Sequence, residues 1–231
     1  MTEHVPDHHP PDHHPTEALL LDYAAGVLHE PASVVVATHM ALCPMCRARV
    51  RDLDAVGGAL LEALPAAAPA AGALDAVLAR LDAPEPLPTV TPLAVPAGLD
   101  AATRRLVPQP LRGYLGANLG DLSWRSIARG LDVHPLPLSR TGFRTELLRM
   151  RRGEGIPRHT HRGHESVLVL DGGFTDESGH FSRGDLALSD DSVIHRPVAD
   201  DDGDCLCLVV LEGGVRFSGP FGLALNLFVR Y

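Results

Sequence analysis

A proline-rich stretch, residues 84–96 (PEPLPTVTPLAVP), constrains the fold of this chain more than any other feature. Each proline fixes its backbone and removes an amide donor, so neither a long helix nor a central strand can run through this stretch. We therefore expect a semi-stiff linker here. Because 231 residues are enough for two domains, the chain is predicted to divide at this point, with few contacts across it.

The chain before this linker has the pattern of a helical domain. A first helix is expected from Thr16, a good N-cap, to about His29, and a second from Pro31 to about Leu42. Pro44 must end the second helix, because the residue before a proline is pushed out of the α region. The same proline can begin a third helix.

A short fourth helix is expected apart from the others. Residues 65–72 (PAAAPAAG) are linker-like in composition. After them, four apolar side chains follow the helical spacing i, i+3, i+4, i+7, namely Leu74, Val77, Leu78 and Leu81. An isolated helix of about ten residues is marginal in water. Its apolar stripe is therefore expected to dock into a groove of another protein.

After about Val107 the pattern changes to short apolar runs, such as ESVLVLDGG and CLCLVVLEGG, separated by Gly and Asp turns. This spacing indicates an all-β barrel or sandwich. The predicted fold class is α+β multidomain, with a small N-terminal all-α domain and a C-terminal all-β barrel. We place a disordered His-rich arm at residues 1–15, the helical domain at 16–84, the linker at 85–106 and the barrel at 107–231.

Charge and cysteine usage narrow the function classes. The net charge of −9 disfavours direct binding of a phosphate backbone, so no nucleic-acid partner is expected. No apolar run is long enough to cross a bilayer, and the His-, Pro- and Asp-rich start is unlike a signal peptide, so a cytoplasmic protein is expected. The four cysteines form two tight pairs, which in a reducing compartment indicates metal or redox chemistry.

The first of these pairs belongs to a metal-binding pattern, His39-x3-Cys43-x2-Cys46. Residues four apart share one face of a helix, and the start of the next helix favours the thiolate form of cysteine. A closed structural zinc site needs a fourth ligand, for which we choose His14. His8, His9 and His13 are alternatives. The competing interpretation is two small buried cysteines beside a surface histidine.

A second metal-binding pattern lies in the expected barrel. The motif G-x5-H-x-H-x3-E-x6-G spans residues 153–172 and matches the first cupin motif. His159 and His161 alternate on a strand and share one face, Glu165 follows, and His195 fits the later histidine of the second cupin motif. This set suits Zn²⁺ or another divalent metal. The alternative is a barrel that has lost its metal and keeps the histidines for packing.

The second cysteine pair, Cys205 and Cys207, also alternates on one strand. The two thiols are either small core residues or oxidisable groups near the barrel metal. A disulfide between positions i and i+2 would be strained, so oxidation there would disturb the barrel. His164 is one residue from Glu165 and is expected to point outward, to solvent.

The chain resembles the ChrR-type zinc anti-sigma factors. The segments that carry the resemblance extend from about His13 to the end, in the same order: LLLDYAAGVL, THMALCPMC, LDAVGGALLE, IPRHTHRGHES and DCLCL. The resemblance implies a helical zinc domain that binds an extracytoplasmic-function sigma factor, in an expected 1:1 complex. It also implies a cupin domain that senses oxidative stress, as singlet oxygen or organic peroxides, and triggers release.

Carried over by position, the resemblance implies one ligand set in each domain. These are His14, His39, Cys43 and Cys46 for Zn²⁺ in the helical domain, and His159, His161, Glu165 and His195 in the cupin. A regulatory anti-sigma factor, which is no enzyme, is the preferred hypothesis. The alternatives are a metal-dependent cupin dioxygenase with a helical oligomerisation module and, more weakly, a zinc-storage protein.

Overall fold

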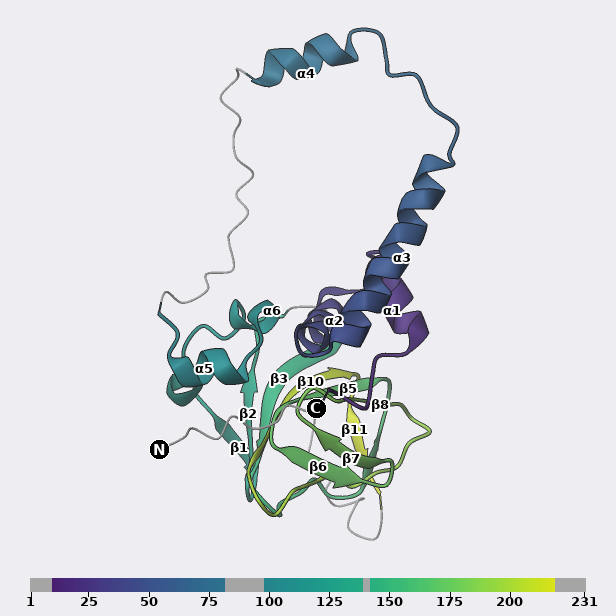
Figure 1. Cartoon of the computed structure of the whole chain (residues 1–231). Helices are drawn as coiled ribbons and strands as arrows, with labels where there is room; N and C mark the ends of the chain where they lie inside the picture. The colour runs from purple at the N-terminus through teal and green to yellow at the C-terminus, as the bar shows by residue number, and fades with distance from the viewer. Residues whose placement is uncertain (1–9, 82–97, 139–141, 219–231) are drawn as a thin grey trace.

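The computed structural model describes residues 10–81, 98–138 and 142–218, and within them a helical part precedes a barrel (Figure 1). The helices are α1 Glu17–Ala24, α2 Glu30–Leu42, α3 Pro44–Glu62, α4 Ala73–Leu81, α5 Ala101–Leu106, α6 Gln109–Arg112 and a 3-10 turn at Leu119–Asp121. The strands are β1 Arg125–Ala128, β2 Leu131–Pro135, β3 Phe143–Met150, β4 His159–His161, β5 Glu165–Asp171, β6 Gly173–Asp176, β7 Gly179–Ser182, β8 Leu186–Ser189, β9 Val198–Ala199, β10 Cys205–Glu212 and β11 Val215–Phe217.

The strands are antiparallel and form the cupin-type barrel that the sequence predicts. One sheet has the order β1-β2-β3-β10-β5-β8, and the smaller sheets are β11-β4 and β7-β6-β9. The proline-rich stretch at residues 84–96 lies outside the described residues. Of the expected arm, residues 1–9 also lie outside them, and residues 10–15 are described. In the part of the chain that is described, no helix combines the length and the apolar character needed to cross a membrane.

The helix boundaries differ from the prediction at one place. Thr16 caps α1 as expected, accepting the amide of Leu19, but the helix ends at Ala24 and not near His29. Gly26 has a φ of +68°, a left-handed conformation that ends a helix and that glycine adopts without strain. His29 instead caps α2, its Nδ1 accepting the amide of Ala32 at 3.2 Å.

Two short helices precede the first strand: α5 lies within the expected linker, residues 85–106, and α6 lies where the all-β pattern was expected to begin. α5 and α6 lie between residues 101 and 112, and the first strand begins only at Arg125. Asp100 caps α5 by accepting the amide of Thr103, and Pro110 stands in the first turn of α6. Neither helix is long enough to show a helical period, so the sequence pattern missed them.

The helical part packs directly on the barrel, which corrects the expectation of few contacts between the domains. Val34 and Val35 of α2 and Leu111 of α6 are buried in the same cluster as the outward side chains of β10, Leu206 and Leu208. The alternate side chains of β10, which include both of its cysteines, face the barrel interior. β10 is therefore buried on both faces, with α2 and α6 serving as the outer layer.

The far half of α3 and the whole of α4 project away from this packed body (Figure 1). α4 has no buried residue. Figure 1 also shows α1 and α2 close to the top of the barrel.

Candidate metal centres

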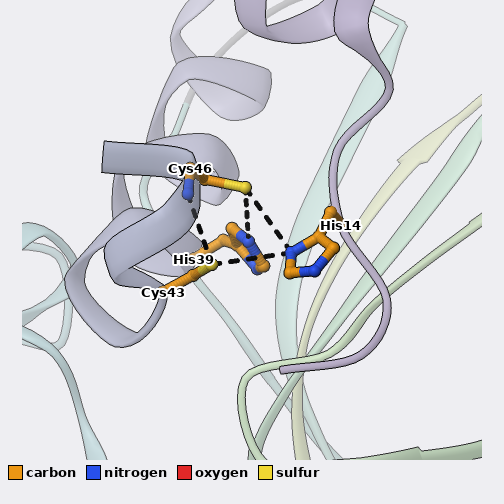
Figure 2. A group of neighbouring side chains, drawn as sticks. All are labelled: His14, His39, Cys43 and Cys46. Carbon is orange, nitrogen blue, oxygen red and sulfur yellow. Dashed lines mark hydrogen bonds between the residues drawn. The ribbon is translucent and has the colours of Figure 1, made fainter. Parts of the chain in front are cut away.

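Four residues from three segments meet beside the barrel. His39 comes from the last turn of α2, Cys43 from the junction of α2 and α3, Cys46 from the first turn of α3, and His14 from the extended segment before α1 (Figure 2). Their ligand atoms all lie within 4.8 Å of one another. The structure thus brings together the four residues that the sequence predicts for the first site.

The chain between His39 and Cys46 has a local reason for this geometry. Cys43 ends α2 in an extended conformation and caps α3, its Sγ accepting the amide of Cys46 at 3.4 Å. Pro44 occupies the first turn of α3, where its missing N–H is no loss. The turn between the helices therefore places both thiols on the side that faces His14.

The spacing of the ligand atoms fits a tetrahedral metal ion. His14 Nδ1 lies 3.5 Å from both Sγ atoms, and His39 Nε2 lies 3.3 Å from Cys46 Sγ. A Zn²⁺ ion with Zn–S near 2.3 Å and Zn–N near 2.0–2.1 Å has S–N tetrahedral edges of about 3.5 Å. The residues present therefore fit a closed metal site without rearrangement.

The electrostatics of this group also favour a cation. Burial lowers the pKa of His39 to about 4, and burial together with the neighbouring Cys43 raises the pKa of Cys46 to about 12. His39 is thus neutral at neutral pH, with a lone pair for a metal. Formation of thiolates needs a positive charge between the sulfur atoms, which a divalent ion supplies.

The alternative histidines proposed for this site are His8, His9 and His13. His13 contacts Phe181 of the barrel, with the ring centroids 4.4 Å apart, and is not in the ligand group. His8 and His9 lie outside the described residues.

The second group lies inside the barrel. His159 and His161 on β4, Glu165 at the start of β5 and His195 before β9 are all buried, and their ligand atoms also lie within 4.8 Å of one another. The Nε2 atom of His195 is 3.1 Å from that of His159 and 3.0 Å from that of His161. Glu165 Oε2 is 3.2 Å from His161 Nε2.

Hydrogen bonds on the far side of two rings show why this group fits a metal ion. His159 donates its Nδ1 hydrogen to the carbonyl of Pro157 at 2.9 Å, and His195 donates its own to Asp176 Oδ2 at 2.9 Å. When both rings are neutral, their Nε2 lone pairs face each other across 3.1 Å. Burial, with the nearby His195, lowers the pKa of His159 to about 4, which keeps that ring neutral. A cation among the nitrogens relieves this repulsion.

Burial dominates the charge state of the carboxylate in this group. It raises the pKa of Glu165 to about 8, although Arg144 opposes the shift. A divalent ion would hold the same carboxylate ionised. The supporting residue Asp176, 3% exposed in its side chain, was missed by sequence reasoning because no spacing rule links it to His195.

Glu165 lines one small cavity of about 20 Å³ and two larger ones. One of the larger cavities, of about 130 Å³, lies in the barrel mouth beside His159 and is walled mainly by apolar side chains, with Arg144 and Glu146 as charged neighbours. The other, of about 430 Å³, lies between α1, α2 and the barrel, and Leu19 and Phe143 are among its lining residues. Glu165 thus borders both the barrel interior and the contact with the helices.

Cys205 and Cys207 are buried in the barrel, with their Sγ atoms 3.5 Å apart. The hydrogen bond with Cys205 and burial raise the pKa of Cys207 well above its ordinary value, so Cys207 is a protonated thiol. His164 is exposed, as predicted, and pairs with Glu212 at 3.1 Å.

The fold and the two groups define a class of protein, a cupin barrel joined to a helical module with its own metal-binding residues. Residues 114–213 match the family model described as ChrR Cupin-like domain. The chain is 40% identical over 215 residues to the anti-sigma-E factor ChrR of Cereibacter sphaeroides, across 93% of this chain and 96% of that protein. It is also similar to the crystal structure of Rhodobacter sphaeroides SigE in complex with the anti-sigma ChrR, with 38% identity, a TM-score of 0.71 and coverage of 87% of this chain and 98% of that one.

The chain belongs to the ChrR family of anti-sigma factors. Membership of this family indicates a regulatory role and not catalysis, which decides against the dioxygenase alternative.

Proposed function

We propose that this chain is a cytoplasmic anti-sigma factor that binds an extracytoplasmic-function sigma factor 1:1 and releases it under oxidative stress. Residues 16–84 would hold the sigma factor, residues 85–106 would connect the domains and residues 107–231 would sense the signal. The relative of known structure is named as a complex of SigE with the anti-sigma ChrR, and that comparison supports the choice of partner.

The observation that carries the proposal is the apolar surface of the projecting helices. Eight large apolar side chains of α3, α4 and their connection are exposed, each by 49% or more: Val56, Leu60, Leu61, Leu64, Leu74, Val77, Leu78 and Leu81. An exposed apolar stripe of this kind along a helix is a surface that a protein partner would cover. Full burial of one such side chain is worth about 1.5–3 kcal/mol, so a partner that covers several gains substantial affinity.

We propose Zn²⁺ at the helical site. Two thiolates and two imidazoles in tetrahedral arrangement are the donor set of structural zinc sites. His14, His39, Cys43 and Cys46 would hold the ion, which would fix the start of α3 against α2 and so orient the projecting surface. In the barrel, His159, His161, Glu165 and His195 would hold Zn²⁺ or another divalent metal, since three imidazoles and a carboxylate suit several ions.

We propose that the barrel is the sensor of singlet oxygen or an organic peroxide. The cavity of about 130 Å³ beside His159 is small and walled mainly by apolar side chains, which suits such molecules. Cys205 and Cys207 would be the oxidised groups: the two thiols give two electrons and two protons either to an organic hydroperoxide, which becomes an alcohol and water, or to singlet oxygen, which becomes hydrogen peroxide. The resulting i, i+2 disulfide would strain β10, and α2 packs on the other face of that strand.

Co-purification tests the proposal. The extracytoplasmic-function sigma factors of the same organism would each be tagged and co-expressed with the full chain. We expect one of them to be retained through affinity and size-exclusion chromatography as a 1:1 complex, and its promoter to be silent in a transcription assay. Retention of none of them would contradict the anti-sigma function.

A further inference from the structure

The turn between β7 and β8 contacts the segment that precedes and carries His14. Gly184 has a φ of +95°, and a Cβ atom at this position would lie 2.7 Å from Pro11 Cγ. Only a glycine leaves room for Pro11 there and adopts this conformation without strain. The turn and residues 11–13 are therefore shaped to fit each other.

Asp185 binds this segment through its carboxylate. Its side chain is 3% exposed, and its Oδ1 accepts the amides of Asp12 at 2.7 Å and His13 at 2.8 Å. Its Oδ2 accepts the amide of Ser182 at 2.7 Å and the hydroxyl of Ser182 at 3.1 Å. A buried carboxylate needs such donors, so Asp185 and the amides before His14 stabilise each other.

The neighbours of Asp185 extend the contact to both histidines of the helical site. Leu186 donates its amide to the carbonyl of His13 at 3.0 Å, immediately before His14. The carbonyl of Gly184 accepts the Nδ1 hydrogen of His39 at 2.8 Å, which leaves Nε2 facing Cys46. Three consecutive barrel residues thus fix the backbone before one candidate ligand and the ring orientation of another.

We propose that Asp185 is a positioning residue for the helical metal site, and that the β7–β8 turn of the barrel holds His14 and His39 in ligating position. The site is then not a property of the helical domain alone. The barrel supplies the outer hydrogen bonds that orient the ligands of this metal site. This inference rests on the proposed function, since it assumes a metal ion at the helical site.

Cobalt substitution separates the two sites. Co²⁺ bound by thiolate sulfur absorbs in the near ultraviolet through charge transfer, whereas Co²⁺ bound by imidazole and carboxylate does not. In the full chain, only the site with Cys43 and Cys46 gives this band, and a graded chelator competition measured on it reports the affinity of that site. The visible d–d absorption that persists after the band is lost reports the barrel site.

The isosteric variant Asp185→Asn puts an amide group where two acceptors are needed. We expect it to lower the affinity of the thiolate site about 10- to 100-fold, the usual effect of losing an outer hydrogen-bond partner, with the barrel signal unchanged. Asp202→Asn removes an equal charge at an exposed position of the barrel and should leave both affinities at the wild-type value.

Three results would overturn the proposal. Equal affinity of the thiolate site in Asp185→Asn and wild type would remove the positioning role. Loss of both cobalt signals together would assign Asp185 to barrel folding instead. Absence of the thiolate band in the wild type would refute the metal ion proposed for the helical site, on which this inference rests, and would leave the anti-sigma function to the co-purification test.

Discussion

The hydrogen bond on the outer nitrogen decides which histidine nitrogen faces each candidate metal centre. The carbonyl of Gly184 does this for His39, that of Pro157 for His159, and the carboxylate of Asp176 for His195. Each of these bonds fixes a ring and a tautomer before any ion arrives. The acceptors come from positions that no ligand motif specifies, so the sequence predicts the ligand group but not its supports.

We expect two metal ions per chain, and the substitution Cys43→Ser should leave one. Loss of a thiolate opens the tetrahedral set at the helical site, while the barrel group lies in a separate core and keeps its four members. Elemental analysis after dialysis against a chelator measures the stoichiometry. Two ions retained by the variant, or one or none by the wild type, would contradict the assignment.

The variant Asp176→Asn tests the support of the barrel site. An amide oxygen can still accept the Nδ1 hydrogen of His195, but without the charge that strengthens this bond. We expect the affinity of the barrel site for Co²⁺ to fall about tenfold or more, with the thiolate band of the helical site unaffected. Chelator competition on the d–d absorption provides the measurement, and an unchanged barrel affinity would show that Asp176 has no such role.

At the scale of elements, the sequence predicts what local periodicity and proline positions control. The junction at Pro44 and the apolar stripe of α4 are found where the pattern puts them. The end of α1 was predicted too late, because apolar residues continue past Gly26 and the glycine ends the helix nonetheless. The continuous apolar run of β10 indicates a strand buried on both faces but does not identify what covers it, since that depends on α2 and α6.

The apolar stripe of α4 gives a prediction for partner binding. The double variant Leu74→Ser, Leu78→Ser should weaken sigma-factor binding by at least about tenfold, because burial of one leucine is worth about 1.5–3 kcal/mol and 1.4 kcal/mol is tenfold in Kd. Thermal stability should be unchanged, since both side chains are exposed.

The matched control for this prediction lies on the opposite face of the same helix. The double variant Ala76→Ser, Ala79→Ser lowers helix propensity at two exposed positions about as much as the leucine variant does. It should bind the sigma factor like the wild type. Isothermal titration with the purified sigma factor compares the three proteins. Equal weakening by both double variants would indicate a loss of helix and not a loss of contact.

At the scale of the whole molecule, the two domains share a hydrophobic core. The proline-rich stretch in the sequence had suggested two domains with few contacts. α2 packs on β5 and β10, and residues 10–14 lie against the β7–β8 turn. β8, which begins after that turn, pairs with β5 at Glu165, the first residue of β5. The segment from Gly184 to His195 therefore runs from the helical metal site to the barrel site. Linker composition describes only the covalent connection and says nothing about surfaces that meet elsewhere.

This arrangement gives a prediction about a truncated chain of residues 1–84. All four candidate ligands of the helical site and the projecting apolar surface lie within it, so we expect it to inhibit the sigma factor on its own. Without the barrel, Val34 and Val35 lose the surface they pack on, and His39 loses the carbonyl of Gly184. The fragment should therefore release its metal to a chelator faster than the full chain does.

The same fragment should keep inhibiting the sigma factor when the oxidative signal is present. A signal shifts a binding equilibrium only if it affects the free and the bound states differently, and the groups proposed to respond lie in the barrel. The matched full-length variant His161→Ala opens the barrel site while keeping the helical group, so it should inhibit normally and respond weakly. Transcription from a sigma-dependent promoter, with and without singlet oxygen, compares the fragment, this variant and the wild type. If the fragment fails to inhibit, or still responds like the full chain, the division between a holding module and a sensing barrel is wrong.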